Sequence, residues 1–534
     1  MSLHIREKKN SSGSISIQII DRKNRGYRVI ETVGCAKSKE EKELYLNIAT
    51  KRVAELNKKY YPSLFDISED KEEKLAFIDL SNKALLPVGD ELIYGKLFER
   101  LGCSHINLDQ KSLKLFKAMV ISRILYPGSK LYLIDYLSYF KQEHIDKNRI
   151  YRFLDTIYQE EIKQEIETCI FNHTQTIMNH TITVTFYDVT TLYFESESED
   201  DLRRIGFSKE SKLAHPQILL GLFTTTEGYP LSYEVYEGNK YEGHTLVDIL
   251  EKFQNRFNLT TKPIVVADKG MLSSANIAYL ENNGYTYILA YKIKMVDEAL
   301  KDKIANTLFN GDGDIHTIDI EKVITYKDSK ETKQKMTIKQ KLILTYSSKR
   351  AKKDKKTREK AIKKIEETLN KKNITKSDLK LSYYAKYLDL KNDDSCVMQY
   401  KLNPTKIELD SKLDGVKGFA TNDFSLKAND VIAHYQNQYD VEKAFRISKT
   451  DLRIRPIYHR LEHRIKAHIL VSFVAYALFK EFERKLKENS ITFDFSGKLL
   501  RNIIAHMYAL NIDGKLLYLK FDDIQQIIYD AVRN

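Results

Sequence analysis

The sequence is poor in several residue types. It has no tryptophan, eight prolines in 534 residues, and four isolated cysteines. Because no CxxC pair occurs, the sequence excludes a zinc knuckle and gives no sign of a disulfide framework, and a reducing cytoplasm is the simplest location. The most apolar helical stretch, near residues 469–478, is too short to span a bilayer, and the N-terminus has no apolar signal region. We therefore expect a cytoplasmic protein without a membrane partner.

Basic side chains outnumber acidic ones. Lysine and arginine total 87 against 74 aspartates and glutamates, which gives a net charge of +13 and a pI near 9.0. This surplus suits a polyanionic partner, and nucleic acid is the leading candidate, although composition leaves a generically basic protein open. The chain is too long for one hydrophobic core, so we expect about two to four domains.

The N-terminal segment is small and basic. Residues 14–20 and 27–33 alternate between apolar and polar side chains around a polar turn, which predicts a β-hairpin. Ser38 and Glu41 make a capping box that opens a charged helix to about residue 60. This module could be an arm that grips DNA or a solvated appendage.

Residues 88–180 are predicted to be helical. Apolar side chains recur at helical spacing from Leu113 to Ile124, and a Pro-Gly pair ends that run. Residues 147–154 predict a short basic amphipathic helix, which could be the recognition helix of a helix-turn-helix. An ordinary bundle helix explains the same pattern equally well.

From Thr181 the hydrophobic period changes to two, which indicates a β-strand. Side chains alternate across a strand, so Val184, Phe186 and Asp188 share one face. A buried carboxylate costs several kcal/mol unless it is paired or bound to a metal. The alternative is that the strand ends at Tyr187 and Asp188 caps a turn.

The elements after this strand follow the order strand, strand, helix, strand, helix, strand. Four apolar residues before Asp268 indicate a fully buried central strand, and open α/β sheets keep their sites at the carboxyl ends of such strands. With its first three strands antiparallel, this is the order of ribonuclease-H-like folds. In that order the first strand neighbours the strand after the first helix, so Asp188 and Asp268 can face each other.

We therefore predict an α/β fold with a ribonuclease-H-like mixed sheet flanked by helices. The predicted domains are a β-hairpin and helix arm at 1–62, a helical, DNA-binding domain at 88–180, a catalytic core at 181–295 and 426–488, a β-rich insertion at 296–425, and a helical C-terminal end at 489–534. The insertion should lie as its own subdomain beside the sheet. Its lysine-rich helix could contact DNA or present a solvated face.

One segment combines an acid and two cations on one predicted helical face. A helix is expected from about Asp430, and at about 100° per residue five polar side chains fall within roughly an 80° arc. They are Tyr435, Gln438, Glu442, Arg446 and Lys449. The alternative is a solvated face on which Glu442 and Arg446 form an i,i+4 ion pair.

These motifs resemble those of bacterial insertion-sequence DDE transposases, in the branch with a β-rich insertion before the glutamate. Asp188 in YDVT, Asp268 in VADKG and Glu442 in the polar helix match the D, D and E of that family. The resemblance covers about residues 180–480, and three motifs in the right order make it specific.

The signature of that branch, Y-x2-R-x3-E-x6-K, runs here from Tyr435 to Lys449. Gln438 replaces the usual arginine, which removes an ionic phosphate contact but allows a hydrogen bond. The resemblance implies that Tyr435 and Lys449 hold the phosphate of the cut DNA end, and Arg446 would attract phosphate one turn from the glutamate. The expected DNA contacts are therefore Tyr435, Gln438, Arg446, Lys449, Arg453 and Arg455.

The predicted chemistry is metal-dependent phosphoryl transfer. Asp188, Asp268 and Glu442 would make an all-oxygen catalytic site, which suits Mg²⁺ or Mn²⁺ and is expected to hold two ions. The resemblance implies cleavage at terminal inverted repeats and transfer of the freed 3′-hydroxyl into target DNA. It further implies a homodimer that holds both ends, in a bacterial cytoplasm and on the nucleoid when bound to DNA.

Two other functions fit the same residues. A catalytically inactive DNA-binding relic would bind terminal repeats without cutting them, and the presence of all three carboxylates argues against it. A ribonuclease-H-like nuclease would cut DNA but join nothing. Joining of a pre-cut end into a plasmid separates that nuclease from a transposase.

Overall fold

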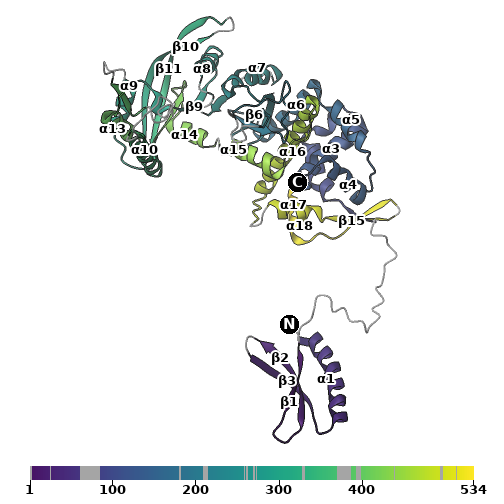
Figure 1. Cartoon of the computed structure of the whole chain (residues 1–534). Coiled ribbons are helices and arrows are strands. Elements are labelled where there is room, and N and C mark those ends of the chain that lie inside the picture. The colour runs from purple at the N-terminus through teal and green to yellow at the C-terminus, as the bar shows by residue number, and fades with distance from the viewer. Residues whose placement is uncertain are drawn as a thin grey trace. The chain divides into compact units, whose positions relative to one another are not determined.

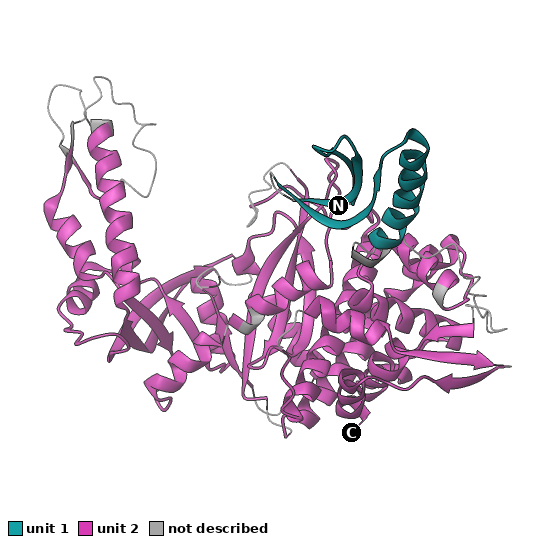
Figure 2. Ribbon diagram, turned by 90° about the horizontal axis from the view of Figure 1, so that it is seen from below, with its two compact units in different colours: residues 1–81 teal, residues 82–534 magenta. Residues whose placement is uncertain are grey.

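The computed structural model describes residues 3–533 except for 24–25, 61–83, 180–181, 208–214, 258, 260–261, 269–270, 272, 328–330, 370–385, 392–398, 438, 494–496 and 513. The chain divides into two compact units, an N-terminal unit at Met1–Ser81 and a main unit at Asn82–Asn534. Figure 2 colours the two units separately.

The N-terminal unit is a three-stranded antiparallel sheet with one helix on it. Its elements are β1 (His4–Lys9), β2 (Ile15–Lys23), β3 (Gly26–Ala36) and α1 (Lys39–Tyr60), and the strand order is β1-β2-β3. The helix packs along one face of the sheet (Figure 1). The predicted hairpin and helix are confirmed, and Ser38 Oγ accepts a bond from the backbone N of Glu41 at 3.2 Å. The first strand, β1, was not predicted.

The main unit begins with a helical region, as predicted. Its elements are β4 (Leu85–Pro87), η2 (Asp90–Gly95), α2 (Lys96–Arg100), η3 (Cys103–His105), α3 (Gln110–Leu125), α4 (Lys130–Phe140), α5 (Lys147–Ile157) and α6 (Glu160–Ile177). In α5, the apolar side chains of Ile150, Phe153 and Leu154 are buried and Arg149 and Arg152 are exposed. The basic face of that helix is therefore open to solvent.

The central sheet has eight strands in the order β10-β11-β14-β9-β8-β5-β6-β7. Its predicted members are β5 (Val184–Tyr193), β6 (Gln217–Thr225), β7 (Pro230–Glu237), β8 (Ile264–Ala267) and β9 (Tyr287–Tyr291), with η4 (Glu242–His244), α7 (Leu246–Phe257) and α8 (Ser274–Asn282) between them. Strands β5, β6 and β7 are antiparallel, whereas β5, β8 and β9 are parallel. This is the predicted ribonuclease-H-like order, with β5 beside β8.

The insertion continues this sheet and does not form a separate one. Strand β14 (Val416–Thr421) pairs with β9, β11 (Lys333–Tyr346) pairs with β14, and β10 (Ile315–Lys327) pairs with β11. The insertion was expected to form its own subdomain beside the sheet, and these strands differ from that expectation. Without β14, the backbone groups along one edge of β9 would be unpaired, and pairing with β14 satisfies them. The other insertion elements are η6 (Ile293–Met295), α9 (Glu298–Ala305), α10 (Ser348–Leu369), β12 (Leu388–Lys391), β13 (Gln399–Leu402) and α13 (Pro404–Lys412).

The segment after the insertion is less regular than predicted. In place of one helix, the chain forms α14 (Ala428–Gln436), α15 (Tyr439–Arg446) and a π-helical turn, η7 (Ile447–Asp451). The following helix, α16 (Glu462–Glu488), is largely buried and belongs to the hydrophobic core. None of the described helices is both long enough and apolar enough to cross a membrane.

The C-terminal end is not purely helical. Between α17 (Gly497–Ala505) and α18 (Asp523–Arg533) lies a hairpin of β15 (Tyr508–Ile512) and β16 (Lys515–Tyr518). Strand β15 also pairs with β4 at the start of the main unit, and this long-range pairing was not visible in the local sequence pattern.

The two faces of the central sheet are covered by different helices. Phe186 and Val266 belong to a hydrophobic cluster shared with α3, α5 and α16, whereas Tyr187 and Val265 face a second cluster with α7 and α8. Alternating side chains of β5 and β8 thus enter two cores, which explains why both strands are apolar on both faces.

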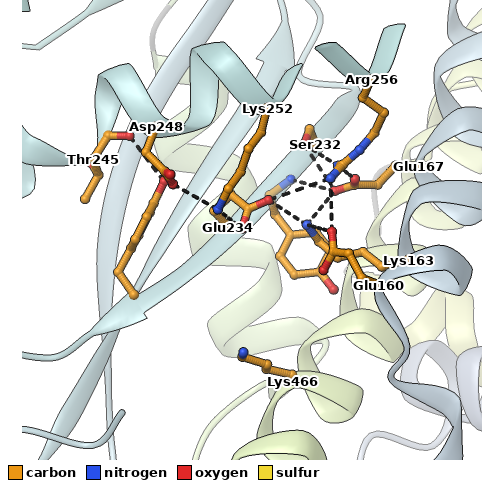
Figure 3. A network of polar contacts seen from close by, with 12 residues as sticks. Glu160, Lys163, Glu167, Ser232, Glu234, Thr245, Asp248, Lys252, Arg256 and Lys466 are labelled. Carbon is orange, nitrogen blue, oxygen red and sulfur yellow. Dashed lines mark hydrogen bonds and ion pairs between the residues drawn. The ribbon is translucent and has the colours of Figure 1, made fainter. Parts of the chain in front are cut away.

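Helix α6 is joined to the edge of this sheet by buried charges (Figure 3). Lys163 Nζ donates to Glu234 Oε1 of β7 at 2.6 Å, and Glu167 accepts from the backbone N of Tyr233 at 3.0 Å. Arg256 of α7 is ion-paired with Glu167, whose side chain is fully buried. The helical region and the sheet are therefore connected by paired charges as well as by apolar contacts.

Candidate active site

The register of two parallel strands places the first two predicted carboxylates side by side. The last paired residues of β5 and β8 are Tyr187 and Ala267, and the next residues along the chain are Asp188 and Asp268. Because side chains alternate, both aspartates lie on the face that carries Phe186 two residues earlier in β5. The two carboxylates are thus neighbours at the carboxyl end of the parallel strands.

Asp188 lies within its strand and does not cap a turn. Strand β5 continues to Tyr193 by antiparallel pairing with β6, in which Asp188 is opposite Leu222. Its side chain is half-buried, and Oδ1 accepts a bond from the backbone N of Val189 at 2.8 Å. The turn-capping alternative is therefore wrong.

Helix α15 brings the third carboxylate to this edge. The helix packs against β5, and Ala444 and Phe445 are buried in the cluster that also contains Phe186. Glu442, from the opposite face of the same turn, is exposed and lines the cleft with Asp188.

Tyr435 of α14 lies in the same cleft and contacts one of the carboxylates. Its hydroxyl donates to Asp268 Oδ1 at 3.0 Å, and its ring centroid lies 4.8 Å from that of Phe419 on β14. Burial raises the pKa of Tyr435 first, and the negative charges of Asp268, Asp188 and Glu442 raise it further. Asp268 is therefore the carboxylate bonded to this hydroxyl, and the charges of Asp188 and Glu442 reach it as well.

These residues line a cleft of about 1070 Å³ at the carboxyl ends of the parallel strands. The three carboxylates share its wall with basic side chains, namely Lys292, Lys294, Arg350, Lys417, Arg446, Lys449 and Arg455. The cations outnumber the acids, so the cleft can accept a polyanion beside its carboxylates.

The family model for the transposase DDE domain matches residues 179–478, which is more than half of the chain. The chain belongs to the DDE transposase family. No curated protein matches the sequence. Among solved structures, a piggyBac transposase in a synaptic complex with hairpin DNA, 9% identical, matches with a TM-score of 0.36 and covers 79% of each chain. Because that match is distant, no residue of this transposase is assigned a role from it.

The predicted DNA contacts of this transposase fall into three groups. Tyr435, Arg446, Lys449 and Arg455 line the cleft with the carboxylates. Arg453 is not among the lining residues, and its guanidinium donates to the backbone carbonyl of Pro127 at 3.4 Å. Gln438 lies outside the described residues.

Two of the cleft cations are held by aromatic rings. The Arg446 guanidinium lies 5.9 Å from the ring centroid of Tyr439, which is 56% exposed, and donates to its hydroxyl at 3.4 Å. The guanidinium of Arg455 lies 5.4 Å from the ring centroid of Tyr193, at the end of β5. Such contacts orient a guanidinium without neutralising its charge.

Sequence reasoning missed four cleft cations, Lys292, Lys294, Arg350 and Lys417. A usable signal existed for the first two, because they directly follow β9, the third parallel strand, at the same sheet edge as the aspartates. Arg350 and Lys417 come from the insertion, and only its unforeseen continuity with the sheet places them in the cleft.

The donor set of the cleft fits a hard divalent cation. Its acidic residues offer oxygen only, and neither cysteine nor histidine is among the lining residues. Within the part of the chain that the structure describes, no three His, Cys, Asp or Glu side chains form a ready-made metal-binding group.

Proposed function

We propose that this transposase performs cut-and-paste transposition of an insertion sequence. It would cleave DNA at the terminal inverted repeats and transfer the freed 3′-hydroxyl into target DNA. The observation that supports the proposal is that Asp188 of β5, Asp268 after β8 and Glu442 of α15 line one basic cleft, in which the Tyr435 hydroxyl donates to Asp268.

Asp188, Asp268 and Glu442 are the residues that would hold Mg²⁺ or Mn²⁺, with two ions as the expected number. When bound, such ions activate the attacking oxygen and stabilise the leaving oxygen of a phosphodiester. In the first reaction, water attacks phosphorus, the P–O3′ bond breaks, and the 3′ oxygen leaves as a hydroxyl. In the second reaction, that hydroxyl attacks a phosphorus atom of target DNA and displaces the target's own 3′ oxygen.

The basic side chains of the cleft would hold the DNA for these steps. Arg446 and Lys449 follow Glu442 by one and two turns along the chain and line the same wall, where they can bind phosphates next to the scissile bond. Because its pKa is raised, the Tyr435 hydroxyl stays protonated and keeps donating to Asp268. Two copies of the chain would hold the two ends, on the DNA of a bacterial cytoplasm.

The test compares carboxylate variants with a matched control. Asp188→Asn, Asp268→Asn and Glu442→Gln should each abolish Mg²⁺-dependent cleavage of a duplex taken from the DNA flanking the gene. Glu408→Gln removes an exposed carboxylate of α13 and should cleave normally. All four variants should still bind the same duplex, as measured by fluorescence anisotropy in the absence of metal.

The outcomes separate the three candidate functions. Near-normal cleavage by any one of the three carboxylate variants would show that our site is wrong. Binding by the wild-type protein without any cleavage would favour an inactive relic. Cleavage without joining of a pre-cut end into a plasmid would favour a nuclease.

A further inference from the structure

The N-terminal sheet has one face that no helix covers within its unit. Strand register places Arg6 opposite Gln18, and Gln18 opposite Thr32, on that face. We call it the outer face. The register of the three strands gives it these side chains: His4, Arg6, Lys8, Ser16, Gln18, Ile20, Arg22, Tyr27, Val29, Thr32 and Cys35.

Two β-bulges in β3 sort the side chains between the faces. At each bulge an extra residue, Ile30 or Val33, turns toward α1 and packs in the small core of the unit. A bulge also increases the local twist of a sheet. Ile30 and Val33 of β3 thus lie under the helix, whereas Val29 and Thr32 lie on the outer face.

Charge is also divided between the two faces. Residues 1–60 contain 14 lysines and arginines against 7 aspartates and glutamates, so about half of the chain's net charge lies here. Glu7 and Glu31 face the helix, where they are ion-paired with Lys42 at 2.8 Å and Arg52 at 3.2 Å. The outer face carries the cations Arg6, Lys8 and Arg22, and no acidic side chain among the described residues.

The centre of the outer face holds an acceptor without a partner. The Oε1 atom of Gln18 is buried and has no hydrogen-bond partner, and its Nε2 makes only a long contact of 3.5 Å to the Thr32 hydroxyl. Beside it, the guanidinium of Arg6 lies 4.1 Å above the ring of Tyr27. A buried polar atom without a partner is costly, so its presence points to a ligand that completes the bonding.

We propose that the outer face binds in the major groove of duplex DNA and reads the transposon end. This inference rests on the proposed function, which gives the transposase DNA ends to recognise. Three strands spaced about 4.8 Å apart span about 10 Å, and the major groove is about 12 Å wide, so the sheet fits with its strands in the groove. The basic, acid-free face complements the phosphates on both rims.

The residues of the outer face divide into two roles. Arg6 and Lys8 on the edge strand bind backbone phosphates, which gives affinity without sequence information. Gln18 on the middle strand reads a base, because a glutamine amide pairs in a bidentate manner with the N6 and N7 edge of adenine. That pairing supplies a donor to the orphan Oε1 atom.

The composition of the face disfavours a protein partner. The centres of protein interfaces are apolar and aromatic and depleted of lysine, whereas on this face polar and basic side chains outnumber the two aliphatic ones, Ile20 and Val29. Tyr27 is 52% exposed, but the Arg6 guanidinium already covers its ring. A second copy of the chain would bring two faces of the same charge together, which is unfavourable.

The test uses the full-length chain and a fluorescent duplex from the DNA that flanks the gene. Arg6→Gln/Lys8→Gln removes two outer-face cations, and Lys39→Gln/Lys51→Gln removes two exposed cations of α1 as the charge-matched control. The outer-face variant should bind at least tenfold more weakly, with a salt slope smaller by about two. The α1 variant should bind like the wild type.

Gln18→Ala tests base reading separately. It should bind an unrelated duplex like the wild type, but lose about tenfold of its preference for the flanking DNA. Circular dichroism and thermal unfolding of every variant confirm that the N-terminal unit remains folded.

The outcomes also separate this proposal from the proposed function. Equal affinities for the outer-face and α1 variants would overturn groove binding, even if the wild type cleaves normally. Selective loss of binding in the outer-face variant, with a wild type that never cleaves, would leave groove binding standing and refute transposition. A change in oligomeric state of the outer-face variant, seen by light scattering without a loss of DNA binding, would assign the face to a second copy.

Discussion

At the scale of single residues, the contact between Tyr435 and Asp268 decides how the site is held. The hydroxyl donates to one carboxylate oxygen, and the ring packs on Phe419 of β14. Asp268 therefore has a fixed orientation toward the cleft, although its own side chain is exposed. In the proposed mechanism, a tyrosine in this position would act through the carboxylate that it orients.

Tyr435→Phe should weaken the response to metal. Groups that orient a metal ligand typically account for about 10–100-fold in metal affinity or activity. We expect a rise of that size in the Mn²⁺ concentration needed for half-maximal cleavage, and a matching loss of Mn²⁺ binding measured by calorimetry. Tyr439→Phe, in the same cleft but without a carboxylate partner among its described contacts, should change either value by less than about threefold.

His459 makes the stability of the main unit sensitive to acid. Burial, together with the positive charges of Lys130, Arg464 and Arg123, lowers the pKa of His459 to about 4. In the unfolded chain a histidine titrates near pH 6.5. The unfolded state therefore binds the proton more readily, so the free energy of unfolding should fall as pH decreases from 6.5 to 4, by at most about 3 kcal/mol.

Urea unfolding at several pH values between 7 and 4 measures this loss. His459→Gln should flatten part of the slope, and His468, whose pKa is lowered mainly by burial, should account for a further part. If the pH dependence of the unfolding free energy is unchanged in a His459→Gln/His468→Gln variant, these two histidines are not its source.

At the scale of elements, the attachment of α6 to β7 and α7 depends on buried charges. Breaking a buried ion pair by removing one partner usually costs about 3–5 kcal/mol, because the other charge stays buried and unpaired. Glu167→Gln leaves Lys163 and Arg256 with one carboxylate fewer, so it should lower the free energy of unfolding by about that amount. Denaturant titration measures it, and Asp389→Asn, in an exposed pair with Lys406, should leave the unfolding midpoint unchanged.

The order of these elements could be predicted, but some of their connections could not. Strands β5 to β9 follow from local hydrophobic period, and their order places Asp188 beside Asp268. The break between α14 and α15 was missed, because helix propensity continues across residue 437 and only packing against β9 and β5 ends each helix. The pairings of β14 with β9 and β15 with β4 join distant segments, which local patterns do not contain.

The candidate site was predictable where a residue follows an apolar strand or lies in a signature. Asp188 and Asp268 stand out because a carboxylate beside a buried run is unusual, and Glu442 stands out through the signature. Lys417 and Arg350 do not stand out, since lysine and arginine are abundant in this chain and their position depends on the insertion. Arg453 also lies near the signature, but its side chain reaches Pro127 outside the cleft lining, so its predicted DNA contact stays a prediction.

At the scale of the whole molecule, the two compact units have separate cores. The described apolar cluster of the N-terminal unit contains Leu3, Ile19 and Leu56, and no described cluster combines residues of both units. A chain that begins at Asn82 should therefore keep the thermal unfolding midpoint of the main unit within about 2 °C, because ordinary losses of about 1 kcal/mol shift large domains by little more. Calorimetry of the two proteins checks this prediction.

The C-terminal end should behave in the opposite way. Removal of residues 506–534 deletes β15, the partner of β4, together with the buried Ile528, Ala531 and Val532 of α18. Each fully buried aliphatic side chain contributes about 1.5–3 kcal/mol, so the loss should exceed about 5 kcal/mol. We expect this truncated chain to be insoluble or to unfold at a much lower temperature than the chain that begins at Asn82.

The continuity of the insertion with the sheet has a consequence for synthesis on the ribosome. The two aspartates emerge first, then the long stretch that supplies β14, and the glutamate emerges only afterwards. A nascent chain that stops inside that stretch lacks Glu442 and leaves the edge of β9 unpaired. Unpaired strand edges promote aggregation. Premature stop codons there should yield a protein that is both harmless to the genome and rapidly degraded.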